Sequence, residues 1–269
     1  MEHEKIIFDE VGVIRMTDNQ IVKYIDDGAN FYVRLFGTAE HMEIVDKNFY
    51  SYVKPKDGEQ GITFIFDVNI ENLPIEMQKE KVSEMKTLSM PIWLGLLAND
   101  ELHFLVYGKE KTHKQTIFSE NDEVYMAMLP HEKPQYNPNE NKIIKVKSME
   151  EFELWAKLTN DLLHGGYPDM HPRYHYSLCQ KDLMSCYILY KDNAPASVAA
   201  VMDNNGITSL EFVATAPEMR RKKLASEICA RAISDTFKNG AKIITLRAIN
   251  LTATRLYLSL GFKAYNYAL

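Results

Sequence analysis

The chain has 269 residues, of which 46% are hydrophobic and 25% charged, an ordinary composition for a folded globular protein. That length fits two modest domains or one large one. The net charge of −6 argues against a general nucleic-acid-binding protein, because such proteins are usually basic overall. No apolar run approaches the ~18 residues that a membrane-spanning helix needs, so we expect no membrane partner either.

The three cysteines, Cys179, Cys186 and Cys229, are odd in number and match no zinc or CxxC spacing. The simplest interpretation is reduced thiols in a protein of the cytoplasm. The first ten residues, MEHEKIIFDE, are acidic and lack the continuous apolar core of a secretory signal peptide. These features together predict a soluble, cytoplasmic protein.

A stretch rich in proline and asparagine divides the chain almost in half. Residues 130–142, PHEKPQYNPNENK, resist regular structure and predict a linker between domains at 1–135 and 141–269. The elements predicted before the linker are strands at Ile62–Val68 and Glu123–Leu129 and a helix at Glu76–Leu88. The first sixty residues hold short apolar runs that indicate no particular element.

The segment after the linker has a clearer order of elements. Ser148 and Glu151 predict a capping box that opens a helix reaching to about His164. The remaining predicted elements are strands at Met184–Tyr190, Ala196–Met202 and Ile207–Thr215, a helix from about Arg221 to Asn239, a strand at Ile243–Arg247, a helix at Thr252–Leu260 and a strand at Phe262–Tyr267. This order predicts a mixed sheet flanked by helices, of the α/β or α+β class.

Four consecutive cations stand at the joint between the strand Ile207–Thr215 and the next helix. They are Arg220, Arg221, Lys222 and Lys223, and Leu224 and Ala225 follow them. A helix N-terminus already carries unpaired N–H groups and a partial positive charge, so basic residues there worsen its electrostatics. A phosphate or pyrophosphate would offset that cost. A solvated run of charges is the alternative interpretation.

A second segment, from Asn250 to Phe262, reads NLTATRLYLSLGF. In this order and spacing the two segments resemble the GNAT superfamily of acetyl-CoA-dependent N-acetyltransferases. Arg220 and Ala225 take the first and last positions of that family's pyrophosphate motif, which is Gln or Arg, two residues, Gly, one residue, then Gly or Ala. The family's ending Asn-x-x-Ala-x-x-Leu-Tyr-x-x-x-Gly-Phe is matched by Asn250, Ala253, Leu256, Tyr257, Gly261 and Phe262. The resemblance implies a GNAT fold over 141–269.

The resemblance also implies an acetyl-CoA site. The backbone of Val213 and Thr215 would pair with the pantetheine arm of coenzyme A. The amides of the cofactor-binding turn would hold the pyrophosphate, and they belong to Arg221, Lys222, Lys223, Leu224 and Ala225. Asn250 would hydrogen-bond the cofactor or the substrate. Tyr257 would stand near the thioester sulfur and protonate the leaving thiolate.

Lys223 departs from the family pattern, because it stands where the motif has its central glycine. Glycine lets the backbone approach phosphates closely and adopt unusual torsions. A lysine in a helical conformation would still offer its N–H group. We therefore expect the substitution to leave cofactor binding possible.

A carboxylate commonly accepts the proton of the attacking amine in such chemistry. Glu211 is the candidate general base, because the period-two alternation of a strand puts it on the face of Val213 and Thr215. A surface or salt-bridged glutamate is the alternative, and the histidines His164, His171 and His175 are further candidates for the base. His171 and His175 lack a carboxylate or cysteine partner, so no metal site is predicted.

The predicted function is transfer of an acetyl group from acetyl-CoA to a primary amine of a small molecule or peptide. The alternative is a non-catalytic acyl-CoA-binding or interaction module with a decayed GNAT site. Residues 62–130 also resemble the N-terminal half of bacterial two-part GNAT proteins, which implies a degenerate GNAT-like domain at 1–135. That half shows no phosphate-binding motif, so we expect one cofactor site per chain. Neither the acceptor nor the oligomeric state is predicted.

Overall fold

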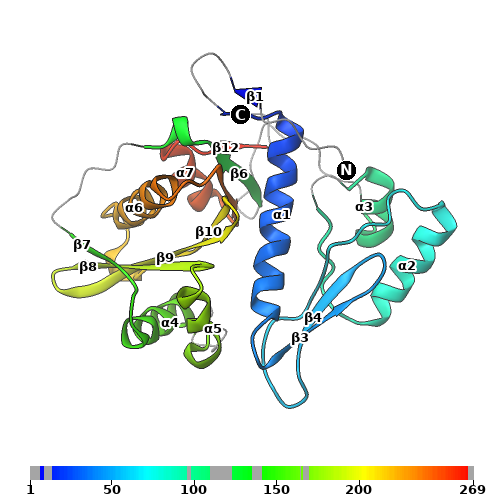
Figure 1. Cartoon of the computed structure of the whole chain (residues 1–269), viewed down its shortest axis with the longest axis horizontal. Helices are drawn as coiled ribbons and strands as arrows, with labels where there is room; N and C mark the ends of the chain where they lie inside the picture. Colours follow the sequence, from blue (N-terminus) through cyan, green and yellow to red (C-terminus); the bar gives the residue numbers. More distant parts are fainter. Residues whose placement is uncertain are drawn as a thin grey trace. The chain divides into compact units, whose positions relative to one another are not determined.

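The computed structural model describes residues 7–8, 14–95, 98–109, 123–134, 141–163, 165 and 170–265. The chain forms two compact units. The larger unit contains Met1–Gly28 and Thr116–Leu269, and the smaller contains Ala29–Gln115 (Figure 1). Within the described ranges, no helix combines the length and the apolar character needed to cross a membrane.

A seven-stranded mixed sheet organises the larger unit, with the strands in the order β12-β6-β11-β10-β9-β8-β7. The strands are β6 Val124–Met128, β7 Lys142–Lys145, β8 Met184–Lys191, β9 Ala194–Asn204, β10 Ile207–Thr215, β11 Ile243–Ala248 and β12 Lys263–Ala264. β10 and β11 are parallel, and the other neighbouring strands of this sheet are antiparallel. A separate antiparallel pair is formed by β1 Ile7–Phe8 and β2 Ile14–Arg15.

Helices cover both faces of this sheet. They are α4 Met149–Leu163, α5 Pro172–Gln180, α6 Leu224–Lys238 and α7 Leu251–Ser259, with short 3-10 turns at Pro130–Glu132 and Pro217–Met219. Figure 1 shows α6 on one face and α4 with α5 on the other. Apolar side chains of α6, among them Ile228 and Ile233, form a buried core with Leu246 and other sheet residues. Burying this stripe is what holds α6 against the sheet.

The elements predicted after the linker are confirmed, with shifted ends. The capping box of α4 is present, because Ser148 Oγ accepts a bond from the Glu151 N–H at 3.2 Å and Glu151 Oε2 accepts one from the Ser148 N–H at 3.3 Å. One segment differs, since the loop expected before β8 contains α5. Pro172 stands at the start of that helix, where its fixed φ and missing N–H group do no harm.

β6 precedes the proline-rich linker but pairs with strands that follow it. Tyr125 lies opposite Arg247 of β11, and Ala127 lies opposite Lys263 of β12. The compact units therefore have other boundaries than the predicted domains at 1–135 and 141–269. The composition of a linker carries no information about which distant strands pair.

The smaller unit holds a three-stranded antiparallel sheet and two helices. The elements are β3 Met42–Asp46, β4 Ser51–Pro55, β5 Phe64–Phe66, α2 Ile75–Thr87 and α3 Asp100–Tyr107. β5 and α2 confirm the strand and the helix predicted there. The long helix α1, Asp18–Gly37, was not predicted, and the boundary between the two units falls within it after Gly28.

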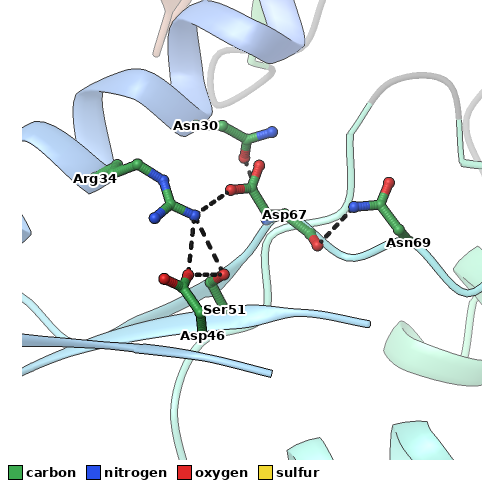
Figure 2. Close-up of polar contacts among 6 residues, drawn as sticks. All are labelled: Asn30, Arg34, Asp46, Ser51, Asp67 and Asn69. Carbon is green, nitrogen blue, oxygen red and sulfur yellow. Dashed lines mark hydrogen bonds and ion pairs between the residues drawn. The ribbon is translucent and has the colours of Figure 1, made fainter. Parts of the chain in front are cut away.

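Arg34 binds the second half of α1 to the small sheet (Figure 2). Its Nη2 donates to Asp67 Oδ2 at 2.8 Å, to Asp46 Oδ1 at 3.1 Å and to Ser51 Oγ at 3.2 Å. Its guanidinium lies over the ring of Phe66, 5.2 Å from the centroid. Hydrogen bonds from Ser51 and Arg34 hold the pKa of Asp46 below its ordinary value. Because these charges are partly exposed, the cluster fixes geometry more than it adds stability.

Candidate functional site

The sheet of the larger unit opens between β10 and β11. Their parallel pairing runs from Ile207 with Ile243 to Ser209 with Thr245. After that point, the described pairings join β10 to β9 alone, while β11 continues beside β6. The carboxyl ends of two neighbouring parallel strands therefore separate and leave backbone groups of β10 facing the gap. An extended ligand can bind such an edge as an added strand.

An extra residue in β10 accompanies this separation. Glu211 lies opposite Ala200 of β9, whereas Ala214 lies opposite Val198, so three steps along β10 match two along β9. Phe212 within this bulge has a φ of +53°. Its ring meets the buried Trp155 of α4 edge-on at a centroid distance of 5.8 Å. A bulge of this kind bends a strand and increases its local twist.

The bulge makes one prediction about Glu211 wrong. Unbroken alternation would put Glu211 on the same face as Val213 and Thr215. In the structure Val213 packs against the core beneath α6, while Glu211 lies across from Ala200, whose two strand neighbours face that core. Glu211 therefore points to the face that carries α4. The inserted residue reverses the alternation, and no residue type in the sequence reveals it.

Ser197 of β9 fixes the end of β10. Its Oγ donates to the Ala214 carbonyl at 2.7 Å and lies 2.9 Å from Thr215 Oγ1. The predicted pantetheine-binding residues, Val213 and Thr215, thus stand on the last, bulged part of β10, where the gap to β11 is open. Their binding of the pantetheine arm stays a prediction.

Charged side chains gather on the α4 face of the opened strands. Burial raises the pKa of Glu211, and the nearby Arg247 of β11 opposes that rise. Arg247 Nη1 lies 3.4 Å from Glu123 Oε1, and the Tyr125 hydroxyl donates to Glu123 Oε2 at 3.3 Å. Sequence reasoning missed Arg247, Glu123 and Tyr125, because only the pairing of β6 with β11 brings them to Glu211.

The predicted phosphate-binding turn follows β10. Arg221 and Lys223 both have positive φ, +63° and +62°, while Lys222 between them does not. No side chain caps α6, and its first internal bond runs from the Glu227 N–H to the Lys223 carbonyl at 3.0 Å. Leu224 and Ala225 therefore open an uncapped helix. Alternating backbone conformations before such an end form a concave set of N–H groups that suits an anion.

Lys223 does not have the conformation that the sequence analysis assumed. It occupies the N-cap position of α6 with left-handed backbone angles, φ +62° and ψ +13°, and α6 begins at Leu224 rather than near Arg221. A glycine adopts these angles freely, whereas a side chain there costs about 1–2 kcal/mol. The N–H group is retained, so the turn keeps its donors. Arg220 is exposed and its Nε donates to the Thr215 carbonyl at 3.3 Å, back toward the end of β10.

Asn250 and Tyr257 lie at the two ends of α7. Asn250 is the N-cap, where its Oδ1 accepts a bond from the Ala253 N–H at 2.9 Å, which leaves the side-chain amide group for other partners. The ring of Tyr257 is buried edge-on against Phe262 at 5.7 Å. Burial raises the pKa of Tyr257 well above its ordinary value, so its hydroxyl keeps its proton at neutral pH.

The histidines proposed as alternative bases have other surroundings. His175 is buried, and its Nδ1 accepts a bond from the His171 N–H at 2.9 Å, which caps the start of α5. The ring of His171 lies 4.9 Å from that of Tyr174. His164 lies outside the described residues. His175 therefore has a structural role at the start of α5.

An opened parallel strand pair followed by an uncapped, concave helix start is an arrangement that suits an extended, phosphate-bearing ligand. Residues 151–262 match the acetyltransferase (GNAT) family, and the chain therefore carries a GNAT-type acyltransferase domain. This result confirms the resemblance noted in the sequence, but it does not extend to the N-terminal residues. No curated protein matches the sequence significantly.

Solved structures share the fold over most of the chain. A GCN5-related N-acetyltransferase from Kribbella flavida has a TM-score of 0.56 and 19% identity, covering 87% of this chain and 90% of its own. A functionally unknown conserved protein from Staphylococcus epidermidis has a TM-score of 0.55 and 10% identity, covering 87% and 93%. At these identities the similarity concerns the fold alone.

The positive φ at Lys223 predicts that Lys223→Gly stabilises the protein. Relief of the strained backbone outweighs the added freedom of the unfolded chain, so the free energy of unfolding should rise by about 0.5–1 kcal/mol. Urea unfolding measures this change. Lys222→Gly is the matched control, because Lys222 has no positive φ, and it should lower stability by a similar amount. A loss of stability in both variants would contradict the backbone geometry described for Lys223.

Proposed function

We propose that the protein transfers an acetyl group from acetyl-CoA to a primary amine of a small molecule or peptide. The observation that carries the proposal is the opened β10–β11 edge leading directly into the uncapped turn before α6, within a GNAT domain. The backbone of Val213 and Thr215 would bind the pantetheine arm along this edge. The amides from Arg221 to Ala225 would bind the pyrophosphate, with Asn250 donating to cofactor or substrate.

Bound acetyl-CoA supplies an activated acetyl thioester. Tyr257 would act on the leaving side of this group, because its buried hydroxyl is a donor at neutral pH. A hydrogen bond or proton from that hydroxyl lowers the energy of the developing thiolate. The nearby Glu211 raises the pKa of Tyr257 further, so the phenol is held in its donor form.

Glu211 would accept the proton that the attacking amine loses. Its carboxyl lies on the α4 face of the bulged strand, and burial gives it a raised pKa. A base whose pKa approaches the working pH accepts protons more effectively than an ordinary carboxylate. The carboxylates of Glu211 and Glu123 also make this face suited to a cationic acceptor, such as an ammonium group before its deprotonation.

A decayed, non-catalytic acyl-CoA-binding domain is the second candidate, and Lys223 is the observation that favours it. A bulky residue with positive φ replaces the glycine of the family motif in the turn that would hold the pyrophosphate. This candidate predicts weak binding or none, or binding without turnover. The retention of Asn250 and Tyr257 at their motif positions favours the enzyme.

Binding of acetyl-CoA tests both candidates. At a ligand concentration of about 100 Kd, binding to the folded state alone should stabilise it by about 2.7 kcal/mol and raise the Tm by roughly 5–10 °C. Acetyl-pantetheine, which lacks the pyrophosphate, is the matched control and should give a much smaller shift. Titration calorimetry should give about one site per chain. Absence of any shift would exclude the proposed enzyme, and binding without acetylation across a broad amine panel would favour the decayed domain.

Tyr257→Phe should lower turnover by about 10²–10⁴-fold, because the variant removes a general acid. Affinity for acetyl-CoA should stay nearly unchanged, since the ring and its packing on Phe262 are preserved. Single-turnover kinetics isolates the chemical step. Tyr190→Phe on β8 serves as the control and should keep full activity. An unchanged rate of acetyl transfer in Tyr257→Phe would remove this hydroxyl from the mechanism.

The pH profile tests Glu211. A base must be deprotonated to act, so a raised pKa moves the acidic limb of kcat/KM above the ordinary range of a glutamate. Glu211→Gln should lower kcat/KM and abolish this limb. Arg247→Met should move the limb to higher pH, because Arg247 lowers the pKa of Glu211. A limb that stays in place in both variants would assign the base to another group.

A further inference from the structure

Two of the three cysteines lie in contact, and only β9 separates one of them from Glu211, because Cys186 and Glu211 both lie opposite Ala200. Cys179 stands in the last turn of α5, and Cys186 is the third residue of β8, which begins at Met184. Their Sγ atoms are 3.7 Å apart and share a hydrogen bond. Both are free thiols, as is Cys229 in the core beneath α6. A disulfide needs the sulfurs about 1.7 Å closer than this, at ~2.05 Å.

The two thiols differ in the way that stepwise oxidation requires. Cys179 is partly exposed, and the hydrogen bond from Cys186 holds the pKa of Cys179 below that of an ordinary thiol, with help from Lys145 and against the effect of burial. Cys186 is fully buried, and burial raises its pKa. A thiolate that solvent reaches is the form that oxidants attack. Cys179 is therefore the cysteine that reacts first with an oxidant, and Cys186 is the resolving cysteine.

A polar concavity of about 540 Å³ lies in the same unit, and neither cysteine lines it. Lys145 and Asp182 line it, and both act electrostatically on the Cys179 thiol. Asp203 and Gly206, from the turn between β9 and β10, line the other side, at the end of β10 away from its bulge. A small oxidant reaches Cys179 through the partial exposure of that residue itself.

We propose that Cys179 and Cys186 form a peroxide-responsive modification site that closes to an intramolecular disulfide. The Cys179 thiolate attacks hydrogen peroxide, the O–O bond breaks, and Cys179 becomes a sulfenic acid while hydroxide leaves and takes a proton. The Cys186 sulfur then attacks the Cys179 sulfur, and the S–O bond breaks with loss of a second water. Two thiols and one peroxide give one disulfide and two waters. The product ties the last turn of α5 to β8.

Peroxide treatment of the reduced full-length protein tests the site. The intact mass should fall by about 2 Da, and thiols titrated after unfolding should drop from three to one. Trypsin should then release a linked pair of peptides, residues 174–181 and 182–191, which reduction separates, because Lys181 lies between the two cysteines. Cys229 should remain alkylatable in residues 224–231, as an internal control for non-specific oxidation.

Three variants complete the test. Cys179→Ser should prevent the loss of thiols altogether, and its partly exposed position tolerates the change. Cys186→Ala should stop the reaction at a sulfenic acid on Cys179, which dimedone traps. Cys229→Ser should leave the linkage unchanged. A Cys179 that oxidises to sulfinic acid while Cys186 stays free, linkage between two chains, or three intact thiols after treatment would each overturn the proposal.

Discussion

The parallel pairing of β10 with β11 ends after Ser209 and Thr245, and the chemistry proposed for the larger unit depends on that ending. Two parallel strands that stayed paired would satisfy each other's backbone groups and leave no edge for a ligand. The extra residue at Phe212 bends β10, and Ser197 fixes the strand's end against β9. The same bulge turns Glu211 away from the core beneath α6. One inserted residue thus produces both the edge and the orientation of the carboxylate.

The local geometry at the two ends of α7 could be predicted because its signals are local. Gly261 has a φ of +100°, and a Cβ there would lie 3.0 Å from the Glu132 carbonyl, so the glycine of the Gly-Phe ending is required by geometry. Asn250 caps α7 as an asparagine at that position should. One or two residue types are enough to recognise such features, so they can be predicted without knowledge of the rest of the fold.

The features that could not be predicted are of two kinds. Some depend on the pairing of distant strands, and others are backbone conformations that the residue type does not favour. The bulge sits at Phe212, a residue with no preference for positive φ. Lys223 likewise has a left-handed backbone conformation, which lysine as a residue type does not favour. The cluster of Arg247 with Glu123 and Tyr125 exists only because β6 pairs with β11, whose residues lie more than a hundred positions away. Helix α1 was missed for a simpler reason, since its apolar residues fall among aspartates and a glycine.

The place of β6 in the sheet has a consequence for synthesis on the ribosome. β6 ends at Met128, whereas its partner β11 begins only at Ile243. At about 5–20 residues per second, roughly 5–25 s pass before the partner strand is made. During that interval both edges of β6 stay unpaired, and the strand consists of one valine, one tyrosine, two methionines and one alanine. The first half of the nascent chain therefore cannot fold completely until β11 has been synthesised. The fraction of nascent chains bound by a chaperone during this interval can be measured.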